Sequence, residues 1–264
     1  MTTPTPFSAL LAQATIEGGR MRVQVPPDWL QGRTVFGGLQ GALAVRAMRS
    51  QVPASLPLRT LQATLIAPST GDLEIETQLL RTGKNATHVE ARIFEKGTLC
   101  AIVIGVFGAR LTSSVSLQPT QAPVGNEQAI AMPFIAGMMP NFIQHYDARL
   151  VRGAFPFTRS AVDESVYEVD LKDQQSPDEY SVVALTDFPP PLALAHLSRP
   201  APGSTLTWML ELLSDDFSQL PRQGFRVDVK LLAARDGYTQ QATMVWSKEG
   251  APLALGHQTM LVFG

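Results

Sequence analysis

The chain has 264 residues, of which 45% are apolar and 17% charged, and its formal net charge is −2. This composition is typical of a soluble globular chain that is long enough for one large or two modest hydrophobic cores. The 21 basic residues are balanced by 23 acidic ones, so we expect no basic surface for nucleic acid. No run reaches the roughly 18 uninterrupted apolar residues of a membrane span. Residues 1–6 lack the pattern of a secretory signal, which predicts a cytoplasmic protein.

The single cysteine, Cys100, lies in the apolar run 99–104 and is expected to be a small buried side chain. One cysteine excludes an intrachain disulfide and a multi-cysteine metal site. The four histidines are isolated and show no H-x-x-x-H spacing, so the sequence predicts no bound metal and no cofactor.

A first group of predicted strands begins near 20–25 and continues at 73–79, where apolar and polar residues alternate with a period of two. Residues 87–93 alternate in the same way after a turn at 82–85. Residues 98–110 are apolar almost throughout, which indicates a central strand buried on both faces. Because short turns join these runs, the strands should be antiparallel.

The same pattern returns in the C-terminal part of the chain. The strands predicted there are 146–157, 225–231, 238–247 and 252–263. Aligning the turn glycine Gly97 with Gly250 brings the two groups of strands into register. The sequence therefore indicates an internal duplication of a unit of about 130 residues.

A predicted helix precedes each group of strands. Residues 37–50 are rich in alanine, leucine and methionine, which is typical of a helix buried on several sides. Residues 181–197 hold the equivalent place, although Pro189–Pro191 interrupt them and are expected to mark a helix N-terminus. The acidic stretch 163–179 is expected to be a solvated loop.

A buried helix and an antiparallel sheet, present twice, predict an α+β fold. Each sheet would wrap its helix, and the two units would join edge to edge in one continuous sheet. We place the N-terminal unit at 1–115, a proline-containing linker at 116–142 and the C-terminal unit at 143–264.

The run Val35-Phe36-Gly37-Gly38 opens the first predicted helix. It resembles the V-F-G-G motif of the double-hotdog acyl-CoA thioesterases, the thioesterase II family and its thioesterase-like relatives, and the resemblance extends from Arg20 to the C-terminus. It implies a double-hotdog fold, a role in fatty acyl metabolism and substrate binding at Phe36, Gly37 and Gly38. Two interpretations of the glycines stay open: close helix–sheet packing, or free N–H groups that hold an acyl carbonyl oxygen.

In that family an aspartate at the start of the second central helix, a threonine or serine on the following strand and a glutamine on the last strand hold the attacking water. The resemblance assigns these roles to Asp187, Thr205 and Gln258. Asp187 would accept the proton of the water, and Thr205 and Gln258 would orient it. Each also has a purely structural interpretation: a helix N-cap, a strand-forming residue and a hydrogen-bonded buried amide. Helix N–H groups and the Gln258 amide both stay open as donors to the oxyanion.

Two departures from the family pattern concern the first unit. Val106-Phe107-Gly108 stands where the family commonly has a glutamine, which predicts that the equivalent site of the first unit is empty. Leu65-Ile66-Ala67-Pro68 lacks the arginine of the family's Phe-Leu-Arg-Pro element. The residues that bind coenzyme A are therefore not identified by the resemblance.

Other hydrolytic and lyase sites fit less well. No G-x-S-x-G elbow is present. Hotdog dehydratases use an Asp and His pair, but Asp187 and His196 would lie about two and a half helical turns apart. The resemblance thus implies an acyl-CoA hydrolase, with a catalytically weak acyl-CoA- or acyl-chain-binding hotdog protein as the alternative. Association through the sheets predicts a homodimer.

Overall fold

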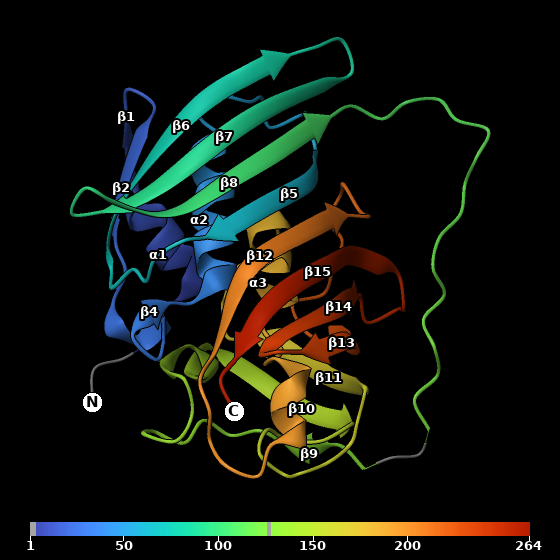
Figure 1. The fold of residues 1–264 in the computed structure, drawn as a ribbon. Coiled ribbons are helices and arrows are strands. Elements are labelled where there is room, and N and C mark those ends of the chain that lie inside the picture. The colour runs from blue at the N-terminus through green and yellow to red at the C-terminus, as the bar shows by residue number, and fades with distance from the viewer. Residues whose placement is uncertain (1–3, 126–127) are drawn as a thin grey trace.

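The computed structural model describes residues 4–125 and 128–264. In these residues a single antiparallel sheet of 13 strands runs in the order β1-β2-β6-β7-β8-β5-β12-β15-β14-β13-β11-β10-β9 (Figure 1). At its centre β5 (Leu58–Leu65) pairs with β12 (Gly203–Leu212), which joins two half-sheets edge to edge. A separate small hairpin consists of β3 (Leu30–Gln31) and β4 (Thr34–Val35). The predicted α+β double hotdog with one continuous sheet is confirmed.

The N-terminal half-sheet confirms the predicted antiparallel meander. Besides β5 it contains β1 (Thr15–Glu17), β2 (Arg20–Gln24), β6 (Asp72–Thr82), β7 (Ala86–Glu95) and β8 (Thr98–Gly108). The prediction that residues 98–110 are buried on both faces is wrong. Ile102, Ile104 and Val106 are only half-buried, because the helices cover one face of the sheet alone.

The C-terminal half-sheet repeats this order. Besides β12 it contains β9 (Ile130–Ala131), β10 (Tyr146–Arg152), β11 (Glu164–Leu171), β13 (Arg226–Arg235), β14 (Tyr238–Trp246) and β15 (Pro252–Val262). The prediction of a solvated loop at 163–179 is wrong for residues 164–171, since β11 pairs there with β10 and β13, whereas residues 172–178 form no helix or strand. The acidic Glu168 and Asp170 of β11 alternate with the buried Tyr167 and Val169. The high acid content hid this period of two.

The helices lie on the concave side of the sheet (Figure 1). They are α1 (Phe7–Gln13), α2 (Gly37–Met48) and α3 (Glu179–Thr186), with 3-10 turns at Pro27–Trp29, Asn141–His145 and Leu192–His196. The predicted start of α3 is wrong by two residues, because Asp178 caps the helix with its carboxylate on the backbone N–H of Ser181, 2.8 Å away. The prolines follow α3, and the 3-10 turn Leu192–His196 begins directly after them with Pro191 as its N-cap, as the prediction of a helix N-terminus there requires. Asp187 is accordingly the C-cap of α3, and its predicted place at a helix start is wrong.

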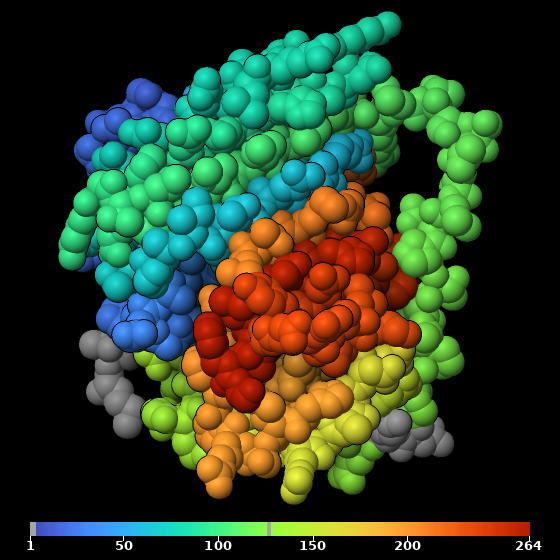
Figure 2. Space-filling model, viewed as in Figure 1, coloured from blue at the N-terminus to red at the C-terminus, as the bar shows by residue number. Residues whose placement is uncertain are grey.

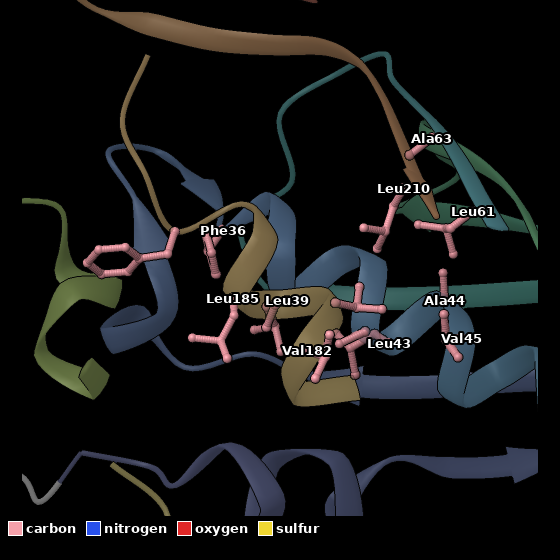
Figure 3. Packing of buried hydrophobic residues seen from close by; sticks show 14 of the residues in the cluster. Phe36, Leu39, Leu43, Ala44, Val45, Leu61, Ala63, Val182, Leu185 and Leu210 are labelled. Atoms are coloured by element: carbon pink, nitrogen blue, oxygen red, sulfur yellow. The ribbon is translucent and has the colours of Figure 1, made fainter. Parts of the chain in front are cut away.

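Helices α2 and α3 pack closely where α2 carries glycine. A Cβ atom at Gly38 would lie 2.7 Å from the carbonyl oxygen of Ala184, so the helix backbones meet where glycine stands. Figure 3 shows Leu39 and Leu43 of α2 beside Val182 and Leu185 of α3. These side chains are at most 1% exposed. The contact fixes the N-terminus of α2 against the C-terminus of α3.

The connection between the half-sheets runs along the outside of the molecule. Residues 109–125 leave β8 and pass beside the C-terminal half-sheet toward β9 (Figures 1 and 2). Within the described residues, no helix combines the length and the apolar character needed to cross a membrane.

Candidate active site

The carboxyl group of Asp187 lies against the first turn of α2. Asp187 is 8% exposed. A Cβ atom at Gly37 would lie 2.6 Å from its Oδ2 atom, which is closer than two such atoms can approach. Only glycine at position 37 therefore leaves room for the carboxyl group, and the N-terminal end of one helix faces the C-terminal end of the other across this contact.

Two donors hold the carboxyl group. The amide Nε2 of Gln258, on β15, donates to Oδ1 of Asp187, and the backbone N–H of Gly38 donates to the same carboxyl group. Burial nevertheless raises the pKa of Asp187 to about 7, with both hydrogen bonds opposing the rise. A carboxyl group with this pKa takes up and releases a proton near neutral pH, as a general base must.

A chain of hydrogen bonds continues behind Gln258. The Nε2 atom of Gln241, on β14, donates to Oε1 of Gln258 over 3.4 Å, and the backbone N–H of Leu192 donates to Oε1 of Gln241 over 2.9 Å. Gln241 is 1% exposed. It orients the Gln258 amide so that Nε2 faces Asp187. Sequence reasoning missed Gln241, although a glutamine directly opposite Gln258 in a buried strand pair was the available signal.

Thr205 reaches the same face of the sheet through a β-bulge. Thr205 pairs with Met260 and Thr207 with Thr259, so that Leu206 is left over between them. The extra residue turns Thr205 toward the buried face, the face of Met260 and Gln258, while Thr207 stays exposed. Among the described residues no hydrogen bond joins Thr205 to Asp187 or Gln258. The structure thus joins Asp187 and Gln258 directly and places Thr205 on the same face of the sheet as Gln258.

Phe36, Gly37 and Gly38, which the sequence predicts to bind substrate, form the entrance to α2. The ring of Phe36 is fully buried and stacks on Phe142, with centroids 4.0 Å apart. Gly37 and Gly38 face Asp187 and α3. The glycines permit the close packing of α2 against Asp187 and α3. That their N–H groups hold an acyl carbonyl oxygen stays a prediction.

Other candidates lie away from this site. His196 is exposed, and its Nε2 lies 2.8 Å from the carbonyl oxygen of Val162, so it forms no pair with Asp187. His257 is exposed while Gln258 is buried, as alternation on a strand requires. Cys100 is 1% exposed, and burial raises the pKa of its thiol, which confirms the predicted buried side chain.

In the N-terminal half, the position equivalent to the Asp187 site lies at the other ends of the two helices, the C-terminus of α2 and the N-terminus of α3. Gly105 and Gln258 lie at the same distance after the turn glycines Gly97 and Gly250, and Val89 pairs with Gly105 as Gln241 pairs with Gln258. A Cβ atom at Gly105 would lie 2.6 Å from the sulfur of Met48. Apolar atoms therefore fill the space that the glutamines occupy in the C-terminal half.

At this position of the N-terminal half, an ion pair stands where the C-terminal half has the carboxyl group of Asp187. Arg49, the C-cap of α2, donates through Nε to Oε1 of Glu179 over 2.6 Å and through Nη2 to Oε2. The two side chains are 11% and 15% exposed, and the guanidinium lies 4.7 Å from the ring centroid of Phe107. This end of the helix pair is closed by a structural contact and lacks the residues of the Asp187 site.

We expect Arg49→Met to lower the free energy of unfolding by about 3 kcal/mol, because it leaves Glu179 charged and unpaired in a mostly buried place. Urea unfolding measures the change. Arg20→Met is the matched control, since the Arg20 side chain is 48% exposed beside Glu74 and Glu76 and should cost less than about 1 kcal/mol. Equal losses in the two variants would contradict a structural role for the Arg49 pair.

Comparisons with known proteins agree with this geometry. Residues 122–262 match the model of the acyl-CoA thioesterase C-terminal domain, and residues 25–108 match that of the acyl-CoA thioesterase N-terminal domain. Among curated proteins, none matches the sequence closely enough to count as a relative.

Solved structures share the fold over the whole chain. A hot dog fold protein of unknown function from Alicyclobacillus acidocaldarius is 22% identical, with a TM-score of 0.83 and coverage of 100% of this chain and 99% of the other. A proposed thioesterase II from Thermobifida fusca is 18% identical, with a TM-score of 0.78 and full coverage of both chains (100%). An acyl-CoA thioesterase II from Mycobacterium marinum is 12% identical, with a TM-score of 0.73 and coverage of 97% and 98%. Since the two domain models follow each other along the chain and the fold agrees throughout, the protein belongs to the acyl-CoA thioesterase family of double-hotdog proteins.

Proposed function

We propose that the chain hydrolyses acyl-CoA thioesters with a water molecule activated by Asp187. The observation that carries the proposal is the carboxyl group of Asp187, which is buried, is held by Gln258 and Gly38, and has its pKa raised to about 7. A solvated carboxylate is a weak base, whereas this one is matched to proton transfer near neutral pH. The family supplies the acyl-CoA substrate class.

The reaction needs no covalent enzyme intermediate. The water oxygen attacks the thioester carbonyl carbon while Asp187 takes one of its protons. The resulting tetrahedral species then breaks its carbon–sulfur bond and leaves the acid, and Asp187 returns the proton to the departing thiolate. Thr205, on the bulged part of β12, is proposed to hold the second hydrogen-bond direction of the water. Gln258 keeps the carboxylate of Asp187 directed at the attacking water.

The first turn of α2 is proposed to receive the reacting end of the substrate. The N-terminal end of a helix carries a partial positive charge, which favours negative charge on the substrate oxygen. Phe36 supplies an apolar wall beside Gly37 and Gly38. A cytoplasmic location, a role in fatty acyl metabolism and a homodimer stay predictions of the sequence.

A panel of acyl-CoA esters of increasing chain length tests the proposal, with release of the free thiol as the readout. We expect turnover with at least one chain length, and loss of turnover in Asp187→Asn. Binding of acyl-CoA without turnover at any chain length would favour the alternative of a non-catalytic acyl-binding protein.

Gly37→Ala should disable the site without unfolding the chain. The added methyl group would overlap Oδ2 of Asp187, so the carboxyl group must swing away from Gly38 and from the substrate. We expect kcat to fall about 30-fold, within the loss that a displacement of about 1 Å can cause. The chain should still fold with a lower melting temperature, since overpacking a buried contact costs about 1–3 kcal/mol. Unchanged kcat would show that the carboxyl position is unimportant.

A further inference from the structure

Tyr146, the first residue of β10, stands in an aromatic cage beside the Asp187 site. Its side chain is 2% exposed. The rings around it come from both halves of the chain. They are Trp29, Phe36, Phe142 and Phe188, with centroid distances between 5.0 and 6.4 Å. Phe36 precedes Gly37 and Phe188 follows Asp187, so the cage positions the tyrosine ring between the two sides of the site.

The hydroxyl of Tyr146 makes no hydrogen bond within the described part of the chain, although it is inaccessible to solvent. Leaving a buried hydroxyl without a partner costs about 1–3 kcal/mol. A phenylalanine would fill the same cage without that cost, so packing alone gives no reason for the oxygen atom. Tyrosine at this position suggests that the hydroxyl meets a partner during function.

That hydroxyl also lies within the electrostatic reach of Asp187. Burial raises the pKa of Tyr146, and the charge of Asp187 raises it further. Tyr146 therefore keeps its proton at every physiological pH and can act only as a neutral donor beside the carboxylate.

Hydrolysis requires a donor for the carbonyl oxygen, which gains negative charge in the transition state. Of the donors that the sequence left open, the Gln258 amide and the Gly38 N–H already donate to Asp187, so the other N–H groups of the first turn of α2 would need a further donor beside them. We propose that the Tyr146 hydroxyl donates a hydrogen bond to the thioester carbonyl oxygen and to the oxyanion formed from it. This inference rests on the proposed function and adds a substrate contact from β10.

Tyr146→Phe tests the role in catalysis. Loss of one oxyanion donor lowers kcat by about 100-fold, so we expect a drop of that order with KM within about twofold. The melting temperature should rise, because phenylalanine removes the unpartnered buried hydroxyl. Tyr167→Phe is the matched control, because Tyr167 is also 2% exposed, packs 6.1 Å from the same Phe188 and lies on the neighbouring strand β11. It should keep wild-type kcat.

The form of the pH profile separates this role from an effect on the base. If Tyr146 serves the oxyanion, Tyr146→Phe lowers the plateau of the pH–rate profile and leaves its midpoint in place. A shifted midpoint with a wild-type plateau would mean that the hydroxyl acts on Asp187 alone, and it would overturn the proposal. Wild-type kcat in Tyr146→Phe, or equal losses in both tyrosine variants, would overturn it as well.

Binding of stable analogues tests the inference independently of turnover. A ketone analogue of acyl-CoA, with a methylene group in place of sulfur, keeps the carbonyl oxygen, and an S-alkyl-CoA of equal length lacks it. We expect Tyr146→Phe to weaken the ketone about fivefold and the S-alkyl compound not at all, since a neutral hydrogen bond contributes about 1 kcal/mol. Equal effects on both ligands would overturn the inference. If the protein shows no turnover but discriminates in this way, the proposed hydrolysis fails while the carbonyl contact stands.

Discussion

Asp187→Asn is expected to lower kcat about 10⁴-fold, the upper range for removing a general base. Asparagine has nearly the shape of aspartate and retains an oxygen that can accept from Gln258, but it cannot take a proton from water. The variant should therefore fold and bind acyl-CoA without hydrolysing it. Thiol release and the dissociation constant of an S-alkyl-CoA measure the two effects.

Asp178→Asn is the matched control for this substitution. Asp178 lies at the other end of α3, where its side chain caps the helix, and asparagine caps about as well as aspartate. We expect wild-type turnover from the control. If Asp187→Asn retained more than about a tenth of wild-type kcat, Asp187 would not be the base.

The pH dependence of hydrolysis should report the raised pKa of Asp187. Only the ionised carboxylate accepts a proton, so kcat/KM is expected to rise with pH up to about 7, the pKa of this group, and to level off above it. An ordinary aspartate, with a pKa of 3.8, would leave the rate flat across that interval. A flat profile between about pH 5 and 8 would contradict Asp187 as the titrating base.

Stability should change in the opposite sense. The folded-state pKa of Asp187 lies above its unfolded value of 3.8, so the folded chain holds a proton that the unfolded chain has lost. The free energy of unfolding of the wild type should therefore fall as pH rises from about 4 to about 7. Asp187→Asn removes this contribution. Relative to the wild type, the variant should gain stability across the interval, and urea unfolding at several pH values measures the difference.

Much of the fold could be predicted because most strands bury one face. In β7, Val89, Ala91 and Ile93 are fully buried between polar neighbours, and the turn at 82–85 marks where the chain reverses. β5 did not show this pattern. A register shift between Leu58 and Thr60 interrupts the alternation of apolar and polar residues in β5. The strand lies at the centre of the sheet, but the polar side chains on its outer face give it the sequence of an exposed segment. The central place of β5 follows from its pairing with β8 and β12, and its local sequence does not indicate that place.

The site was also predicted only in part, because some of its contacts join segments that are far apart in the sequence. The resemblance identified Asp187 and Gln258, and the structure joins them by a hydrogen bond. It did not show that Gly37 is needed to make room for Asp187, because that contact links the two halves of the chain. Tyr146 had no sequence signal either. Its hydroxyl is distinctive only through what surrounds it, and those rings come from four separate segments.

Gln258→Ala is expected to lower kcat about 10³-fold near pH 7 with little change in melting temperature, as for a member of a catalytic set that acts as a unit. The loss has two causes. Asp187 loses the donor that aims it, and its pKa, which the Gln258 hydrogen bond lowers, rises further. The midpoint of the pH–rate profile should therefore move upward, and part of the activity should return at higher pH.

Two further variants decide whether Gln258 works through Asp187. In the double variant Asp187→Asn/Gln258→Ala, kcat should equal that of Asp187→Asn alone, since an amide cannot steer a base that is absent. Gln241→Leu removes the partner that orients Gln258 and also the acceptor of the Leu192 N–H. It should cost about tenfold in kcat, less than Gln258→Ala itself, because Gln241 acts on Asp187 only through Gln258. Losses that multiply in the double variant would mean that Gln258 acts on the substrate by its own contact, and the chain of hydrogen bonds from Leu192 to Asp187 would then serve the fold rather than the base.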